Sequence, residues 1–224
     1  MPVLPMHIIQ NSPTSFQAED CHTFTDVEGV FEAFGSSLRI ENRRILIDGL
    51  EIKLTCDPGH IGGSFWLSSI AMLMYMRSNK QEFAGKRVLE LGAGTALPSI
   101  YLSKACCDMV VASDLDIVPA LHSIGANPCR VIPVTLDWSS ESHGLFDVVV
   151  ACDCVYRANH ESFARAVLAH LAPGGTLYMV NPQREGFDEC LYLLEEQLSC
   201  HATETEMQVA GSVASITLVK AHKD

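Results

Sequence analysis

The 224-residue sequence lacks the usual metal-binding spacings and any long apolar run. Its nine cysteines include no CxxC pair, and its nine histidines form no HExxH or CxxC...HxxxH pattern. Most protein zinc sites use such spacings, so we expect no metal site and read the cysteines as structural free thiols in a reducing compartment. No apolar run reaches the roughly 18 to 20 residues that cross a bilayer, so we expect no membrane association.

Basic residues are also scarce, and the N-terminus has no features of a secretory signal. It lacks a basic start, a long apolar stretch and a small-residue cleavage site, so we expect a cytoplasmic protein, with the nucleus left open. Acidic residues outnumber basic ones by 27 to 15, which gives a net charge of −12. This balance disfavours a broad phosphate-binding surface and therefore a nucleic-acid partner. It suits a basic polypeptide partner, but it also suits ordinary solubility.

The order of patterns along the chain predicts one folding unit with an N-terminal addition. Residues 38–54, "LRIENRRILIDGLEIKL", contain β-prone runs with reversals at "ENRR" and "DG", so we assign residues 1–60 to an extension with a β-hairpin. Residues 61–224 form the main domain. It starts with a largely apolar helix in "SFWLSSIAMLMYMRSNKQ".

From residue 87 onward, apolar strands alternate with helices. We predict strands at 87–91, 109–113, 130–136, 146–151 and 176–180, and helices at 95–104, 116–124, 159–171 and 186–198. Runs such as "FDVVVA" are apolar without alternation, which is typical of strands covered on both faces. Two further strands in "HATETEMQVAGSVASITLVKA" should form a hairpin that closes one edge of the sheet. The predicted fold class is α/β, with a doubly wound, mostly parallel seven-stranded sheet and a small N-terminal β elaboration.

The loop "VLELGAGTALPSI", residues 88–100, differs from a dinucleotide-binding loop. Gly92 and Gly94 match the first two glycines of GxGxxG, but Leu97 stands at the third and the small residue is Ala96. The acid Glu90 precedes the glycines, so the string reads ExGxGxA and resembles the first motif of S-adenosylmethionine-dependent methyltransferases. A dinucleotide brings a pyrophosphate to a helix N-terminus, whereas S-adenosylmethionine brings an amino and a carboxylate group. NAD-linked oxidoreduction is therefore the weakest alternative.

Two acids and a tryptophan follow the next predicted strands. Asp114 lies about 20 residues beyond the glycine loop, where a carboxylate usually binds a ribose diol, although with Asp116 it could also cap the next helix. Asp137 and Trp138 follow the third strand in "LDWS", and the flat face of the tryptophan suits an adenine ring. Packing in the core is the alternative for Trp138.

The fourth strand ends in "ACDCVY", which contains Cys152, Asp153 and Tyr156. Ligands of open parallel sheets bind beyond the carboxyl ends of the strands. Four successive strand ends carry candidate side chains, and this coincidence carries more weight than any one motif.

Six stretches together resemble the methyltransferase-like 21 group, or family 16, of protein lysine methyltransferases. They are "GGSFW", "VLELGAGTALPSI", "ASDLD", "LDWS", "FDVVVACDCVY" and "APGGTLYMV", within roughly residues 40 to 220. The resemblance implies that Asp153 and Tyr156 of a DxxY motif face the methyl acceptor. It implies a cofactor site formed by Trp66, Glu90, Gly92, Ala93, Gly94, Asp114, Asp137, Trp138 and Cys152. The chain departs from the family pattern at Ala96, in place of the third glycine, and in "NPQRE", where Arg184 is the only arginine.

The resemblance implies transfer of a methyl group from S-adenosylmethionine to a lysine of a protein, and we expect a monomer. A lysine ammonium with a pKa near 10.4 must lose its proton before it attacks, which costs roughly 4 to 5 kcal/mol at pH 7. We assign Asp153 to orienting the amine and Tyr156 to lining its channel. Methylation of a small-molecule amine, or cofactor binding without catalysis, are the alternatives that the sequence leaves open.

Overall fold

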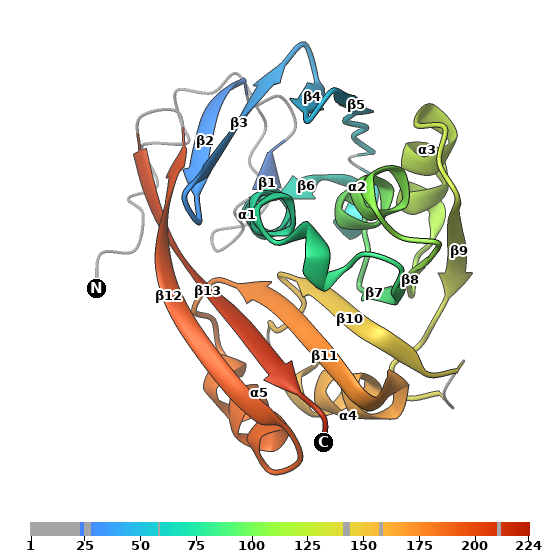
Figure 1. Cartoon of the computed structure of the whole chain (residues 1–224), viewed down its shortest axis with the longest axis vertical. Helices are drawn as coiled ribbons and strands as arrows, with labels where there is room; N and C mark the ends of the chain where they lie inside the picture. Colours follow the sequence, from blue (N-terminus) through green and yellow to red (C-terminus); the bar gives the residue numbers. More distant parts are fainter. Residues whose placement is uncertain (1–22, 25–27, 58, 141–143, 157–158, 210–211) are drawn as a thin grey trace.

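A computed structural model describes residues 23–24, 28–57, 59–140, 144–156, 159–209 and 212–224. Its centre is an eleven-stranded mixed sheet in the order β5-β4-β3-β2-β12-β13-β11-β10-β7-β8-β9 (Figure 1). The last five of these strands are parallel to one another. They are β11 (Leu171–Asn181), β10 (Phe146–Cys152), β7 (Arg87–Leu91), β8 (Met109–Asp114) and β9 (Val131–Thr135).

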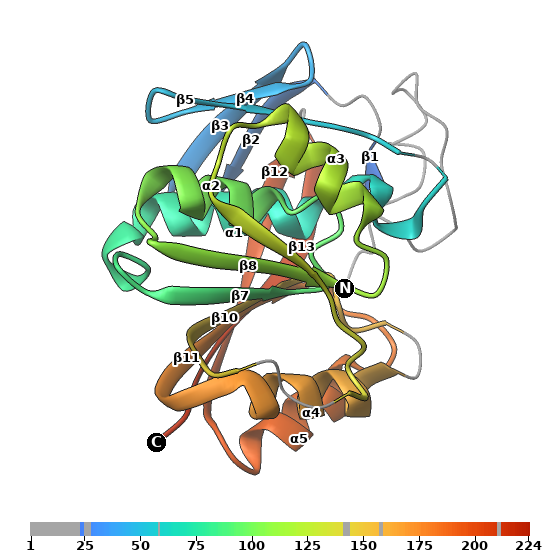
Figure 2. The same cartoon turned by 90° about the vertical axis from the view of Figure 1, so that its right-hand side faces the viewer.

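Helices cover both faces of these parallel strands, so the predicted doubly wound α/β class is confirmed. Figure 2 shows the first three helices on one face and the last two on the other. They are α1 (Leu67–Ser78), α2 (Leu97–Ala105), α3 (Val118–Ala126), α4 (His160–His170) and α5 (Phe187–Glu195). All five parallel strands and the four helices that follow them overlap the predicted ranges. The unalternating apolar runs are buried as expected, since six of the seven residues of β10 are buried.

Four N-terminal strands form a further layer outside the first helix layer (Figure 2). They are β2 (Gly29–Ala33), β3 (Ser36–Glu41), β4 (Arg44–Ile47) and β5 (Leu50–Lys53). The predicted reversals are the turns between them, because Asn42, Arg43 and Asp48 all have positive φ angles near 50°. The alternating burial of β3 and β4 gives this layer one apolar face, which packs toward the helices.

Helix α1 lies between this strand layer and the parallel sheet. It contacts β2 and β3 on one side and β11 on the other. Nine of its twelve residues are buried, which explains why its sequence is apolar without a polar stripe. A short strand pair, β1 (Thr23–Phe24) with β6 (Phe65–Trp66), precedes the helix, and single 3₁₀ turns lie at Ile61–Gly63 (η2) and Lys80–Glu82 (η3).

The C-terminal strands β12 (Ser199–Val209) and β13 (Ser212–His222) pair antiparallel as predicted, but they do not close an edge. The far end of β12 pairs with β2 at Gln208 and Glu32, and this contact continues the sheet into the N-terminal strands. The expectation of an edge hairpin was therefore wrong. It failed because the sequence of β12 does not reveal which distant strand its outer edge meets.

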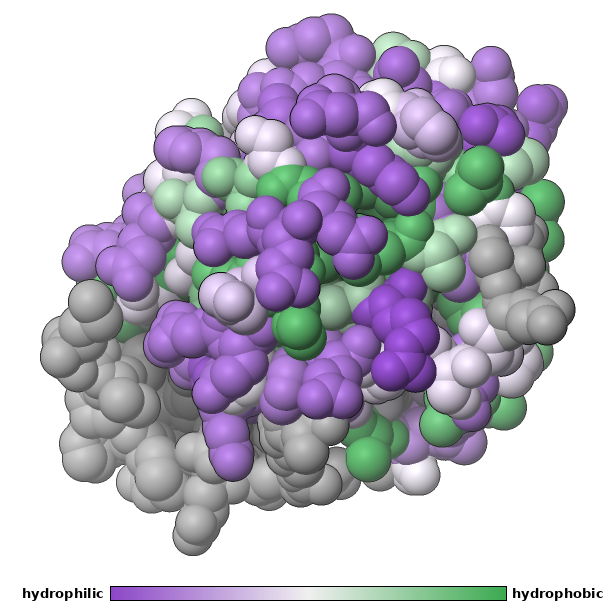
Figure 3. Space-filling view, turned by 90° about the horizontal axis from the view of Figure 1, so that it is seen from below, coloured by the Kyte–Doolittle hydropathy of each residue, from purple (hydrophilic) through white to green (hydrophobic). Residues whose placement is uncertain are grey.

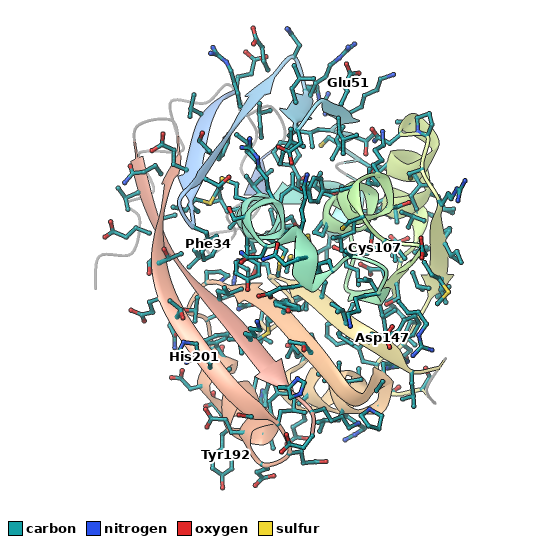
Figure 4. The ribbon with its side chains drawn as sticks, viewed as in Figure 1. Phe34, Glu51, Cys107, Asp147, Tyr192 and His201 are labelled. Atoms are coloured by element: carbon teal, nitrogen blue, oxygen red, sulfur yellow. The ribbon has the colours of Figure 1, made fainter. Side chains whose placement is uncertain are left out.

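An ion pair joins the amino ends of two of the parallel strands. Arg87 at the start of β7 pairs with Asp147 at the start of β10, with an Nη2–Oδ1 distance of 2.9 Å. Figure 4 labels Asp147 together with Cys107, which precedes β8. The carboxyl ends, where the candidate side chains lie, are therefore at the opposite end of the sheet.

The outer face formed by α4 and α5 is mainly hydrophilic, with apolar surface between the polar side chains (Figure 3). All eight cysteines in the described ranges are free thiols. Within the same ranges, no helix has the length and apolar character that a membrane span requires. The described residues also contain no cluster of three or more side chains suited to a metal ion.

Asn127 joins the N-terminal strands to α3. Its side chain is 1% exposed, accepts a hydrogen bond from the Lys53 amide at 2.8 Å, and donates to the carbonyls of Lys53 and Ser123. We predict that Asn127→Ala lowers the free energy of unfolding by about 1 to 3 kcal/mol, because buried backbone groups lose their partners. Urea unfolding would measure this. The exposed Gln197→Ala is the control, and equal stability of the two variants would contradict the prediction.

Candidate active site

The glycine loop connects β7 to α2 and has three left-handed residues. Gly92, Gly94 and Ala96 have φ angles of 63°, 50° and 55°. A Cβ at Gly92 would lie 2.7 Å from Cys154 Sγ, so this position has room only for glycine. Ala96 is fully buried and precedes the first turn of α2, which explains why a small residue stands there. The Ala93 amide donates to the Ser113 carbonyl at 2.9 Å and fixes the loop to β8.

Glu90 lies behind this loop and is 1% exposed. Its Oε2 accepts hydrogen bonds from the amide of Ser99 at 3.0 Å and from the Ser99 hydroxyl. Burial raises the pKa of Glu90 to about 8, while the Ser99 bonds act in the opposite direction. The structure thus places Glu90 as an organiser of the loop. Ser99 was not identified from the sequence, although it lies inside the quoted motif.

Asp114 lies at the carboxyl end of β8, directly beside the loop. Its Oδ2 accepts a hydrogen bond from the Gly94 amide at 2.8 Å, and its Oδ1 accepts one from the Asp116 amide at 3.2 Å. Burial raises the pKa of its carboxyl group. The next residue, Leu115, is 70% exposed and adds apolar surface to this rim. Sequence reasoning missed Leu115, because exposed leucines are common. Its position next to Asp114 was the only signal of a place in the site.

The segment before α1 crosses over the glycine loop. A Cβ on Gly94 would lie 2.9 Å from the carbonyl oxygen of Gly62, so the two backbones are in close contact. His60 pairs with Asp116, and His122 of α3 pairs with Asp57 at 3.2 Å. These two contacts connect the segment to the region after β8. A few residues further along, Trp66 is half-buried, ends β6 and directly precedes α1.

Trp138 lies on the other side of the loop, after β9. Its ring is 3.4 Å from the Cβ that a side chain at Gly92 would have, and it packs edge-on against Phe163 at 5.3 Å between centroids. The predicted partner Asp137 is exposed, and its Oδ1 accepts hydrogen bonds from the amide and hydroxyl of Ser139. The structure therefore places Trp138 beside the loop. The Asp137 carboxylate instead bonds Ser139 within the turn that follows β9.

Beyond β10, the DxxY segment lies at the same end of the sheet. Cys152 is buried, and the following Asp153 has a φ angle of 55° and a side chain that is 3% exposed. Asp153 forms an ion pair with Arg184, at 2.8 Å between Oδ1 and Nε. Tyr156 is 39% exposed and so presents its ring at the surface of the site.

Two asparagines hold the DxxY segment, and sequence reasoning missed both. Asn181 is fully buried at the end of β11, where it accepts from the Val155 amide and donates to the Val155 carbonyl, both at 3.1 Å. Asn159 accepts from the Tyr156 amide at 3.0 Å and donates to the Cys154 carbonyl at 2.8 Å. An asparagine at the end of a strand or before a helix gives no sequence signal for such a role.

These features fit an amino-acid nucleoside better than a dinucleotide. The loop approaches its neighbours through glycines, the Asp114 carboxylate lies at the rim, and an aromatic ring lies beside Gly92. A pyrophosphate needs free amides at a helix N-terminus, but the Ser99 amide at the start of α2 is already bonded to Glu90. The residues present therefore fit S-adenosylmethionine.

The comparison with protein families agrees with this geometry. A family model described as "Lysine methyltransferase" matches residues 47–194, about two thirds of the chain. The chain belongs to this family. Members of the family use S-adenosylmethionine to methylate protein lysines, so the predicted enzyme class and cofactor are confirmed.

Two curated proteins and one solved structure illustrate what this chain is similar to. EEF1A lysine methyltransferase 3 of Mus musculus is 28% identical over 158 residues, covering 64% of this chain and 67% of its relative. Calmodulin-lysine N-methyltransferase of Arabidopsis thaliana is 26% identical over 183 residues, covering 74% and 59%. The T. thermophilus 16S rRNA N2 G1207 methyltransferase has the same fold, with a TM-score of 0.61, 20% identity, and coverage of 88% of this chain and 51% of the other.

Glu90 should make the stability of the cofactor-free protein depend on pH. Its folded-state pKa of about 8 exceeds the ordinary value of 4.5, so its contribution to stability is fully present below pH 4.5 and declines as the pH rises to about 8. We predict that Glu90→Gln has a higher free energy of unfolding than the parent at pH 8, by roughly 1 kcal/mol or more, with a smaller difference at pH 5. Urea unfolding would show this as a higher midpoint. Equal midpoints at pH 8 would contradict the burial argument.

The His60–Asp116 pair should be visible by titration. The hydrogen bond and charge of Asp116 raise the pKa of His60 above its usual 6.5. The contribution of this pair is therefore present below pH 6.5 and lost as the pH rises through the raised value. We predict that Asp116→Asn moves the pKa of His60 back toward 6.5 in an NMR titration of the ring protons. Asp137→Asn serves as the control. If the pKa of His60 in Asp116→Asn equalled that in the parent, the pair would not form in solution.

Proposed function

We propose that this chain transfers the methyl group of S-adenosylmethionine to a lysine side chain of a protein, with the cofactor at the loop after β7 and the acceptor at the DxxY segment. The observation that carries the proposal is the assembly of loop, acid and aromatic ring at one end of the sheet. Asp114 binds the Gly94 amide, and Trp138 lies beside Gly92. The family match supplies the lysine acceptor.

Several residues of the chain would hold the cofactor. Asp114 would accept hydrogen bonds from the ribose, and Trp138 with Leu115 would offer apolar surface to the adenine. Glu90 would keep the loop in shape through its hydrogen bonds to Ser99. Trp66 at the end of β6 and Cys152 at the end of β10 would border the site.

Bound S-adenosylmethionine supplies a methyl group on a positively charged sulfur. For the chain, the remaining task is to align the acceptor nitrogen with that methyl group and to receive the amine in its neutral form. Tyr156 would line the acceptor channel, since its ring is exposed at the end of β10. Asp153 would act at the same place, together with its partner Arg184.

The partner should be a protein rather than a nucleic acid. The net charge of −12 supports a partner with a basic surface and disfavours a phosphate backbone. EEF1A and calmodulin appear in the names of relatives, and they are proteins. We further propose a monomer that works in the cytoplasm, away from membranes.

Radiolabel transfer tests the proposal. The purified chain is incubated with S-adenosylmethionine, labelled on the methyl group, and cell extract. Label should enter a protein band and be recovered as methyl-lysine after hydrolysis. Label in the small-molecule fraction would instead favour a small amine as acceptor. Thermal stabilisation by the cofactor without any transfer would mean binding without catalysis.

Asp114 should contribute strongly to cofactor affinity. A hydrogen bond to a charged group contributes about 1.5 to 3 kcal/mol, so we predict that Asp114→Ala raises the Kd for S-adenosylhomocysteine about 10- to 100-fold in calorimetry. Glu196→Ala, at the exposed end of α5, is the control and should bind like the parent. An unchanged Kd in Asp114→Ala would remove Asp114 from the cofactor site.

A further inference from the structure

The acid of the DxxY segment is paired with one arginine. Arg184 Nη2 donates a hydrogen bond to Asp153 Oδ2 at 2.9 Å, and its Nε lies 2.8 Å from Oδ1. The two side chains are only 12% and 3% exposed. One charge-assisted hydrogen bond and one close ion-pair contact thus join the guanidinium to the two carboxylate oxygens.

The surrounding backbone holds Asp153 in place. The Asp153 amide donates to the Val180 carbonyl at 2.9 Å, and its left-handed φ of 55° turns the chain away from β10. Arg184 lies between β11 and α5, and its carbonyl accepts the amide of Phe187 at 3.1 Å. The pair therefore joins the chain after β10 to the chain after β11.

An unpaired carboxylate at the acceptor site would oppose the reaction. It would attract a lysine ammonium and hold the proton that must leave before the nitrogen can attack. Among the described residues, the thiols of Cys152 and Cys154 also interact with the charge of Asp153, and burial raises the pKa of both thiols well above their usual value. They stay neutral, and Arg184 supplies the positive charge that pairs with Asp153.

We infer that Arg184 is a positioning residue of the methyl-acceptor site, which occupies Asp153 so that this carboxylate does not trap the acceptor lysine as an ammonium ion. The inference rests on the proposed function. It changes the role expected for Asp153, from a free acid that orients the amine to one half of a neutralised pair.

The test compares the pH dependence of kcat in Arg184→Met and the parent, with the protein that takes up label in cell extract as substrate. In the variant, Asp153 is free to pair with the lysine, so the rise of kcat should move to higher pH by about one unit. That shift corresponds to a tenfold lower neutral fraction at a given pH. KM should fall or stay constant, because the charged lysine binds to the freed acid.

A second variant separates this effect from a loss of folding. Asp153→Asn/Arg184→Met removes the trapping acid together with the arginine, so the pH profile should return to that of the parent. Arg184→Lys keeps the charge and should leave the profile near the parent. Arg165→Met, on the exposed face of α4, is the control. An unshifted profile in Arg184→Met, or an equal shift in the double variant, would overturn the inference.

An NMR measurement does not depend on methyl transfer. Burial raises the pKa of Asp153 and Arg184 lowers it, so the carboxyl carbon of Asp153 should titrate at higher pH in Arg184→Met than in the parent. An unchanged titration would show that the pair does not form in solution. If the pair forms but the parent labels no protein, it is the proposed function that fails.

Discussion

The candidate site depends on a buried carboxylate that is bonded to the start of a helix. Glu90 at the end of β7 accepts hydrogen bonds from Ser99 in the first turns of α2, and its own carbonyl accepts the hydroxyl of Ser113 from β8. A carboxylate at this depth is costly unless it is bonded, so the loop between β7 and α2 has little freedom. The left-handed angles at Gly92, Gly94 and Ala96 follow from the need to turn the chain within this short span.

The two halves of the site lie on either side of this loop and are held by different means. On the side of β8, the Asp114 carboxylate accepts the Gly94 amide, and the crossing segment at Gly62 touches the loop backbone. On the side of β10, Asn181 and Asn159 bond the main chain of the DxxY segment, and Arg184 bonds its acid. Close backbone contact occurs on the first side, whereas side chains hold the second.

Much of this arrangement could be predicted from the sequence, because apolar runs mark buried parallel strands and polar residues mark their ends. Glu90, Asp114, Trp138 and Asp153 all lie at one end of the sheet for this reason. The partners of these residues could not be predicted. Ser99, Asn181 and Arg184 act through hydrogen bonds whose geometry depends on how separate segments meet, and neither spacing nor hydropathy encodes that. The contact of β2 with β12 escaped prediction for the same reason.

That contact also sets a constraint on the order in which the chain folds. Phe31 of β2 is paired opposite Val209 of β12, so the sheet becomes continuous only when segments from near both ends of the described chain meet. Contacts this far apart in sequence form slowly, because a long loop must be closed first. On the ribosome, the N-terminal strands emerge long before their partner strand. Until that strand arrives, they contact the rest of the fold through their packing on the helices and through the hydrogen bonds between Lys53 and Asn127.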